Sequence, residues 1–258
     1  IGLTRYWAKY KNISRSIPAI ASWASALIFG FGLNALDVMS FYYLFIPTWI
    51  FTIILYTVLA KKYGVYLVAG TIPLLSSCGE KFTNSCCVFS PEGQLVSQYN
   101  KIHLFDVNVT DAVGHYKESN FIEPGELNAV VLDVDGLKVG LSICYDLRFP
   151  ELYRALVDKG AELLLVPAAF TYVTGQAHWN TLLRSRAIEN QAFVMGVNQC
   201  GYHTKTRRTF GHSVCYSPWG DDLGQLGDDP ENLYISINPA HIQECKSSMP
   251  VLEHRRFT

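Results

Sequence analysis

Charged side chains are scarce at the start of this sequence, where Asp37 is the only one between Ile17 and Ala60. The stretch 41–60, FYYLFIPTWIFTIILYTVLA, carries no charge, and about 20 apolar residues span a bilayer. Residues 17–36 are a weaker candidate, and the basic residues before the first stretch and after the second suit a hairpin of two spans whose ends are both cytoplasmic. Pro47 interrupts the run, and an apolar core or non-native sequence explains the same composition. Hydropathy therefore leaves membrane attachment as one alternative.

A large net charge is also missing. The 258 residues include 21 Lys and Arg and 22 Asp and Glu, which gives a formal net charge of −1. Proteins that bind nucleic acid through their overall charge are strongly basic, so nucleic acid is not an expected partner. The seven cysteines are odd in number, and their spacing fits no zinc site. We therefore expect reduced thiols in an intracellular compartment, and no bound metal.

From residue 58 onward the sequence is typical of an α/β domain. Its short apolar runs are bounded by glycine, proline or charge, as in buried strands. These predicted strands lie at 65–70, 137–144, 161–170 and 192–197. Apolar spacing and helix-end residues predict helices at 149–160 and 176–191. Hairpins are expected to turn at 91–93 and 135–136.

The stretch LSICYDLRFPELYR, 141–154, places Cys144 where an apolar run ends and a polar, aromatic segment begins. A cysteine between a strand and a helix lies near backbone N–H groups that can stabilise an oxyanion. A free thiol has a pKa of about 8.5, so a nucleophilic cysteine needs a base or a nearby cation. The local pattern fits either such a nucleophile or an inert core cysteine.

Two charged residues could supply what a nucleophilic cysteine needs. Lys101, in YNKIHLFDV, follows a predicted strand and precedes apolar residues, where a solvated lysine is out of place. It is expected either to stabilise an oxyanion or to deter pairing at a sheet edge. Glu118, in HYKESNFIEPG, is expected either to hold Lys101 or a leaving amine, or to be a solvated loop carboxylate.

These residues belong to motifs that resemble the carbon–nitrogen hydrolase (nitrilase) superfamily. The motifs are KIHLFDV, ESNFIEPG, GLSICYDLRFPELYRAL, VPAAFTYVTGQAHWNTLLRSRAIENQAFV, NQCGYH, GHSVCYSPWG and MPVLEHRR. Within the superfamily, TGQAHW, NQCGYH and PVLEHRR are most similar to the deaminated glutathione amidase branch. The resemblance implies an α/β fold, a four-layer α–β–β–α sandwich, that forms a homodimer or higher oligomer through its helix layer.

The resemblance also implies hydrolysis of a small amide through a cysteine thioester, without cofactor or metal. Cys144 matches the nucleophile, Lys101 matches the catalytic lysine, and Glu118 matches a supporting second glutamate. The Tyr145 N–H is expected to bind the oxyanion together with Lys101. The other residues expected to bind substrate are Arg148, Phe170, Thr174 and His178.

One residue that the resemblance implies is missing. The family's first glutamate, at the end of an N-terminal strand, transfers the thiol proton. No glutamate precedes Glu80 here, and Asp37 lacks the expected motif around it. Residues 1–57 do not resemble the family. We therefore divide the chain into an atypical hydrophobic segment, 1–57, and a hydrolase domain, 58–258, with a fold that is incomplete or irregular at the N-terminus.

Three interpretations remain open. In the first, the N-terminal stretch is mistranslated or mis-spliced, and the native protein is an ordinary cytoplasmic or mitochondrial amidase. Its expected substrate is a small carboxylate-bearing amide such as deaminated glutathione, which the basic loop 205–208 would attract. In the second, the chain is a catalytically impaired scaffold with the same fold. In the third, it is a membrane-tethered member of the superfamily.

Overall fold

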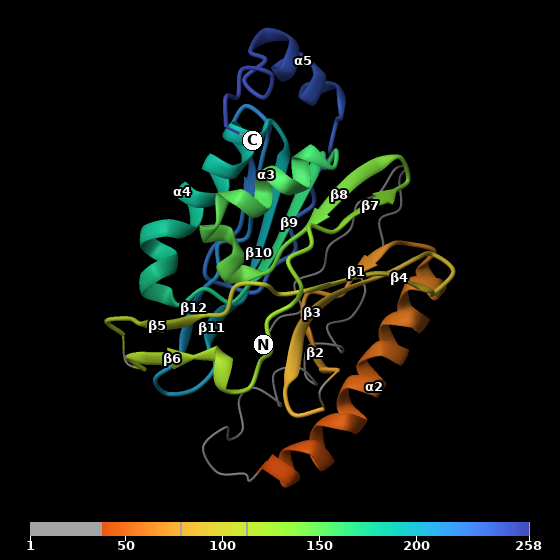
Figure 1. The fold of residues 1–258 in the computed structure, drawn as a ribbon, viewed down its shortest axis with the longest axis vertical. Coiled ribbons are helices and arrows are strands. Elements are labelled where there is room, and N and C mark those ends of the chain that lie inside the picture. The colour runs from red at the N-terminus through yellow and green to blue at the C-terminus, as the bar shows by residue number, and fades with distance from the viewer. Residues whose placement is uncertain (1–37, 78, 112, 258) are drawn as a thin grey trace.

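The computed structural model describes residues 38–77, 79–111 and 113–257, with side chains from Ile50 onward. Asp37, the weak candidate for the missing proton-transfer group, lies outside these residues. The described chain contains two main sheets, between helices that cover their outer faces. Figure 1 shows α2 on one side of the strands, and α3 and α4 on the other.

Helix α2 (Val38–Tyr63) contains the whole charge-free run 41–60. Its side chains Tyr56 and Ala60 are buried and pack against the smaller sheet. Its opposite face leaves Ile50, Phe51, Ile54 and Val58 exposed. Among the described residues, no helix is long and apolar enough to cross a membrane. The helix also crosses residue 57, where the sequence placed a domain boundary.

The smaller sheet is built around one long strand, β3 (Phe82–Phe89). One edge of β3 pairs with β1 (Leu67–Val68) and β2 (Ile72–Leu75), and the other pairs with β4 (Leu95–Asn100). Side chains alternate along a strand, so Cys87 and Phe89 face α2 while Cys86 and Val88 face the larger sheet. Burial on both faces places this sheet in the middle of the molecule.

In the larger sheet, described as six-stranded, the order is β14–β13–β10–β9–β8–β7. Its strands are β7 (Val131–Val134), β8 (Leu137–Leu141), β9 (Leu163–Ala168), β10 (Phe193–Asn198), β13 (Val214–Tyr216) and β14 (Asp222–Gln225). The central strands β8, β9 and β10 run parallel, and the outer pairs are antiparallel. The crossovers are α3 (Pro150–Asp158) and α4 (Tyr172–Asn190), whose buried side chains join the main core.

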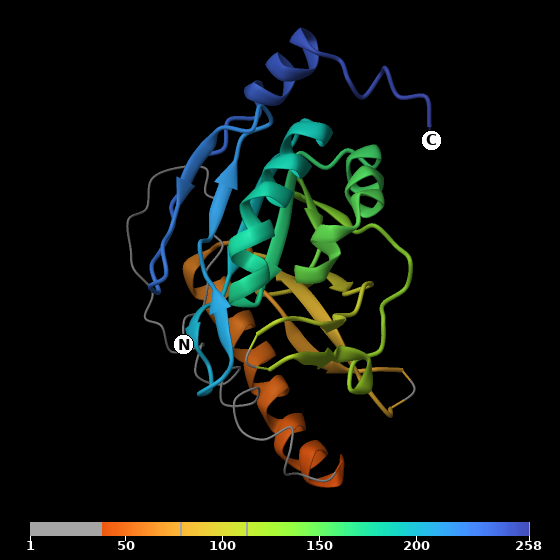
Figure 2. The same ribbon diagram turned by 90° about the vertical axis from the view of Figure 1, so that its left-hand side faces the viewer.

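Small elements complete the described chain. Two ribbons, β5–β6 and β11–β12, lie outside the two main sheets (Figure 1), and α5 lies near the C-terminal end of the chain (Figure 2). Their bounds are β5 (Asp106–Asn108), β6 (His115–Lys117), β11 (Cys200–Tyr202), β12 (Arg208–Phe210) and α5 (Ala240–Ser248). Short helical turns cover Glu118–Asn120 and Cys144–Arg148. In order, the four layers are α2, the smaller sheet, the larger sheet, and α3 together with α4. This is the expected α–β–β–α order.

Most of the predicted elements are confirmed, and the differences have local causes. Both hairpins turn where expected, with Gly93, Asp135 and Gly136 at positive φ. Helix α4 begins before the predicted 176–191, because the Thr171 side chain accepts a hydrogen bond from the N–H of Thr174 and caps it. The strand predicted at 65–70 keeps only the two residues of β1.

Candidate active site

Cys144 lies where the chain leaves the carboxyl end of β8. The strand is held beside β9 up to Ser142, whose N–H donates to the Leu165 carbonyl at 3.1 Å. Cys144 then adopts φ +50°, in the left-handed region, and opens the turn Cys144–Arg148. A residue other than glycine in this region costs on the order of 1 kcal/mol or more, and such strain gathers at active sites. Cys144 is partly buried as a residue.

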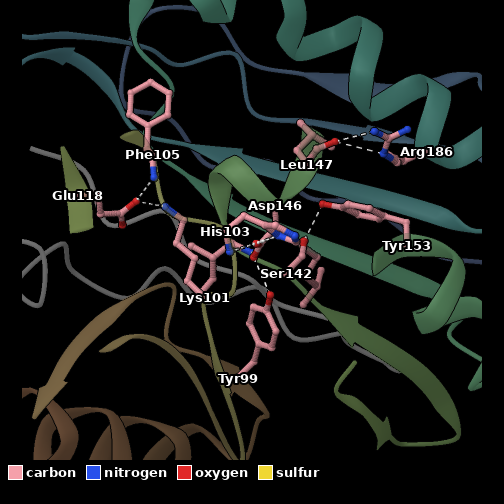
Figure 3. Close-up of polar contacts among 12 residues, drawn as sticks. Tyr99, Lys101, His103, Phe105, Glu118, Ser142, Asp146, Leu147, Tyr153 and Arg186 are labelled. Atoms are coloured by element: carbon pink, nitrogen blue, oxygen red, sulfur yellow. Dashed lines mark hydrogen bonds and ion pairs between the residues drawn. The ribbon is translucent and has the colours of Figure 1, made fainter. Parts of the chain in front are cut away.

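Buried polar contacts hold the turn that follows Cys144 in place. Arg186, on α4, donates from Nε (3.2 Å) and Nη2 (2.9 Å) to the Leu147 carbonyl. The Ser142 hydroxyl hydrogen-bonds to the Tyr153 hydroxyl at 2.8 Å, from strand to α3 (Figure 3). Asp146 is fully buried inside the turn and makes further contacts. The strained cysteine therefore has rigid support on both sides.

Lys101 and Glu118 form an ion pair close to the turn. Lys101 follows β4 and is only 2% exposed, and its Nζ donates to Glu118 Oε2 (Figure 3). The same oxygen accepts from the Phe105 N–H at 2.7 Å, and Oε1 accepts from the Asn84 amide at 3.4 Å. These contacts fix the carboxylate, which in turn fixes the ammonium. The reading of Lys101 as a solvated edge-strand lysine does not fit this burial.

The charges of Lys101 and Glu118 both affect the pKa of the Cys144 thiol. Burial raises the pKa of the thiol, and the Lys101 ammonium and the Ala169 backbone act in the opposite direction. The Glu118 and Asp146 carboxylates add to the increase, and the net direction is upward. Less of the thiol is therefore ionised at neutral pH than in a free cysteine. A nucleophile of this kind depends on a group that accepts its proton during attack.

The residues expected to bind substrate lie around the same turn. The guanidinium of Arg148 stands 5.7 Å from the Tyr145 ring centre and 5.4 Å from that of Phe170, which are cation–π distances. His178, on the exposed face of α4, approaches Arg148 with Nδ1 at 3.3 Å. Thr174 also lies on α4, where its hydroxyl hydrogen-bonds to that of Thr171 at 2.8 Å. The structure thus gathers Tyr145, Arg148, Phe170 and His178, and gives Thr174 a local capping contact.

The sequence did not single out three residues of this site, Asp146, Tyr99 and His103. Both oxygens of Asp146 are used by donors from the segment around Lys101. The only signal was the position of Asp146 shortly after Cys144. Its partners lie more than forty residues away in the chain, and their contact depends on how the two sheets stack.

The described residues contain no counterpart of the missing proton-transfer glutamate. Among them, the carboxylates that influence the Cys144 thiol are those of Glu118 and Asp146. Glu118 is engaged with Lys101, and Asp146 is enclosed by hydrogen-bond donors. Neither is free to take up the thiol proton without giving up a structural partner.

Comparisons with known proteins agree with this geometry. Residues 50–247 match the carbon-nitrogen hydrolase family. The deaminated glutathione amidase of Yersinia enterocolitica is 44% identical over 200 residues, which cover 77% of this chain and 70% of that protein. The omega-amidase NIT2 of Danio rerio is 37% identical over 197 residues, 76% of this chain and 70% of that protein.

A solved structure supports the same assignment. Nit3 of Saccharomyces cerevisiae, a member of the nitrilase superfamily, aligns with a TM-score of 0.70 and 33% identity. The alignment covers 80% of this chain and 71% of the yeast chain. The nitrilase fold and the amidase class predicted from the motifs are therefore confirmed. By its sequence, its layered sheets and its relatives, this chain belongs to the carbon–nitrogen hydrolase family.

Proposed function

We propose that the chain hydrolyses a small carboxylate-bearing amide, similar to deaminated glutathione, with Cys144 as the nucleophile. The observation that carries this proposal is a strained, partly buried cysteine beside a lysine–glutamate pair whose lysine is buried. An ammonium held this firmly in a poorly solvated place stabilises negative charge better than a solvated one. Such a pair is costly as a purely structural device.

The reaction follows from these positions. The Cys144 sulfur forms a bond to the amide carbonyl carbon, and the oxygen gains negative charge. Lys101 and the Tyr145 N–H, in the first turn after the strand, stabilise that oxygen. Glu118 orients Lys101. The C–N bond then breaks as the leaving nitrogen takes up the proton lost by the Cys144 thiol, and water breaks the C–S bond of the thioester to give the carboxylic acid and the free thiol. Both steps need a proton carrier, so we expect the chain as written to turn over slowly.

The chemistry of the substrate is inferred from cations near the turn. Arg148, held between two aromatic rings, leaves a planar guanidinium suited to a carboxylate. The loop between β11 and β12 adds Lys205 and Arg207, and Arg208 begins β12. The names of the relatives, deaminated glutathione amidase and omega-amidase, both describe amides. These features favour a substrate that carries a carboxylate away from the amide.

Acylation of the protein tests the proposal. Incubation with deaminated glutathione followed by rapid acid quenching is expected to show a thioester adduct by intact mass, located on the peptide with Cys144. Cys144→Ala should lose both the adduct and any amide hydrolysis. Cys200→Ala is the matched control, because Cys200 is also partly buried. A folded wild-type chain that forms no adduct would favour the scaffold interpretation instead.

The same proposal includes the quaternary structure and compartment. A homodimer or higher oligomer through the helix layer would cover Val173 and Ile188 of α4 and the nearby Trp219, which are exposed in the single chain. A small-molecule amide is then the main partner. We place the protein in the cytoplasm or mitochondrion, in keeping with its six described free cysteines. Light scattering of the purified chain reads its oligomeric state directly.

A further inference from the structure

One buried carboxylate joins the segment that carries the lysine to the turn that carries the cysteine. Asp146 has no exposed surface, and its two oxygens accept four hydrogen bonds (Figure 3). Oδ1 accepts from the N–H (3.0 Å) and from Nδ1 (2.8 Å) of His103. Oδ2 accepts from the Tyr99 hydroxyl (2.7 Å) and from the Ile143 N–H (2.9 Å). A carboxylate has about four acceptor sites, so this one is saturated.

The contacts on the lysine side enclose Lys101. Tyr99 precedes it at the end of β4, and His103 follows it. Burial, and next the Asp146 charge, raise the pKa of the Tyr99 phenol, which therefore stays protonated and donates. The His103 ring stacks on Phe149 with centres 3.7 Å apart, which fixes the imidazole as well. Both ends of this short segment are thus tied to one carboxylate.

The contacts on the cysteine side enclose Cys144 in the same way. Ile143 N–H donates to Oδ2 of Asp146, and Asp146 N–H donates to the Ile143 carbonyl at 3.0 Å. This reciprocal pair closes the turn around Cys144 and holds it at φ +50°. Lys101 and Cys144 come from different sheets, and contacts across sheets are set by packing rather than by backbone pairing.

We propose that Asp146 is a positioning residue that sets where the Lys101 ammonium lies relative to the Cys144 sulfur. The inference rests on the proposed function only in taking Cys144 as the reacting thiol. Asparagine has the same shape as aspartate but turns one acceptor into a donor. In Asp146→Asn at least two of the four donors would lose their acceptor, and the two segments would separate. A misplacement of about 1 Å at an active site can cost a hundredfold in rate.

The charge of Asp146 and its positioning role predict opposite effects of Asp146→Asn on the pKa of the Cys144 thiol. The Asp146 charge raises the pKa of Cys144, whereas the Lys101 ammonium lowers it. If Asp146 acted only as a charge, Asp146→Asn would lower the thiol pKa and speed alkylation. If it holds Lys101 beside the sulfur, its loss moves the ammonium away and raises the pKa. A role confined to global stability would leave the thiol pKa of the folded protein unchanged.

The experiment is the pH dependence of Cys144 alkylation by iodoacetamide, followed by peptide mass spectrometry. For folded Asp146→Asn we expect the pKa of the Cys144 thiol to lie above that of wild type. The alkylation rate near pH 8 should be about one third of the wild-type rate or smaller. Asp158→Asn is the matched control, since Asp158 is exposed and pairs with Arg255. An unchanged or lowered thiol pKa in Asp146→Asn would overturn the proposal.

A second variant keeps the test valid if Asp146→Asn does not fold. Tyr99→Phe keeps the carboxylate charge and removes one of its four donors, and it should raise the thiol pKa in the same direction by less. Amide kinetics give an independent readout: kcat should fall about tenfold or more with KM little changed. If the wild type hydrolyses no amide, the proposed function fails, while the alkylation result still decides the role of Asp146.

Discussion

At the scale of single residues, the site contains two buried charges, Lys101 and Asp146, which are stabilised in different ways. The Lys101 ammonium is almost fully buried and has one carboxylate partner, Glu118. Among the described residues, Asp146 is fully buried and forms no ion pair with a lysine or arginine, but has four neutral or histidine donors. A buried charge is tolerated only when it is paired or saturated with hydrogen bonds. The Lys101–Glu118 pair holds an ammonium close to Cys144, and the hydrogen bonds of Asp146 fix the backbone on both sides of the site.

The Lys101–Glu118 pair predicts unequal effects of its two single variants on stability. Glu118→Gln leaves a buried ammonium without its counter-charge, so we expect a loss of about 3 kcal/mol in unfolding free energy. Lys101→Met replaces the ammonium by an apolar chain of similar volume, and the less buried Glu118 keeps its Phe105 N–H, so the loss should be smaller. Both variants should lose acylation. Urea unfolding checks the order, and equal losses would contradict it.

The residues that could be found from sequence are those with a local signal. Cys144, Lys101 and Glu118 each stand in a recognisable motif, and the structure brings Lys101 and Glu118 together beside the turn of Cys144. The role of Asp146 could not be found in this way. Its donor Tyr99 lies on β4 of the other sheet and its donor His103 follows that strand, so the contact exists only after the sheets have stacked.

At the scale of elements, the best predicted parts were those in which local chemistry and the core agree. The β7–β8 hairpin follows from Asp135 and Gly136, which adopt the positive φ values that such a turn requires. Helix α3 follows from Pro150 at its start and Gly160 after its end. Helix α4 starts earlier than predicted because the cap at Thr171, rather than the apolar spacing, sets its start.

The early start of α4 has a structural consequence that can be tested at Gly175. This helical glycine packs so closely on β12 that an added Cβ would lie 2.3 Å from the Phe210 Cβ. That atom is fixed to the backbone and cannot rotate away, so Gly175→Ala must separate α4 from β12. We expect the unfolding free energy to fall by about 1–3 kcal/mol, despite the better helix propensity of alanine.

The matched control for Gly175 is Gly227. An added Cβ at Gly227 would meet no atom within 4 Å, so Gly227→Ala should change stability little. Chemical denaturation of both variants gives the comparison. Gly175→Ala with wild-type stability would show that the approach of α4 to β12 is looser than the structure indicates.

At the scale of the whole molecule, the described chain forms four layers even though its first residues do not resemble the family. Tyr56 and Ala60 of α2 bury the outer face of the smaller sheet, against Cys87 and Phe89 of β3. The apolar composition that suggested a membrane segment is thus partly explained by this packing. The segments that carry Cys144, Lys101 and Glu118 are held by the two sheets and by α3 and α4, all of which lie within the part of the chain that matches the family.

The described residues of the four layers include no group that can carry the thiol proton to the leaving nitrogen. This leads to a prediction for the entire chain. Replacing residues 1–57 by the N-terminal segment of the Yersinia enterocolitica relative should add the strand-end glutamate that the family resemblance implies. General acid–base catalysis contributes about 10²- to 10⁴-fold, so kcat for a small amide should rise by at least about a hundredfold. The same chimera with Cys144→Ala should be inactive, and one with the incoming glutamate changed to glutamine should lose the gain. A folded chimera that turns over no faster than the present chain would show that proton transfer is not what limits it.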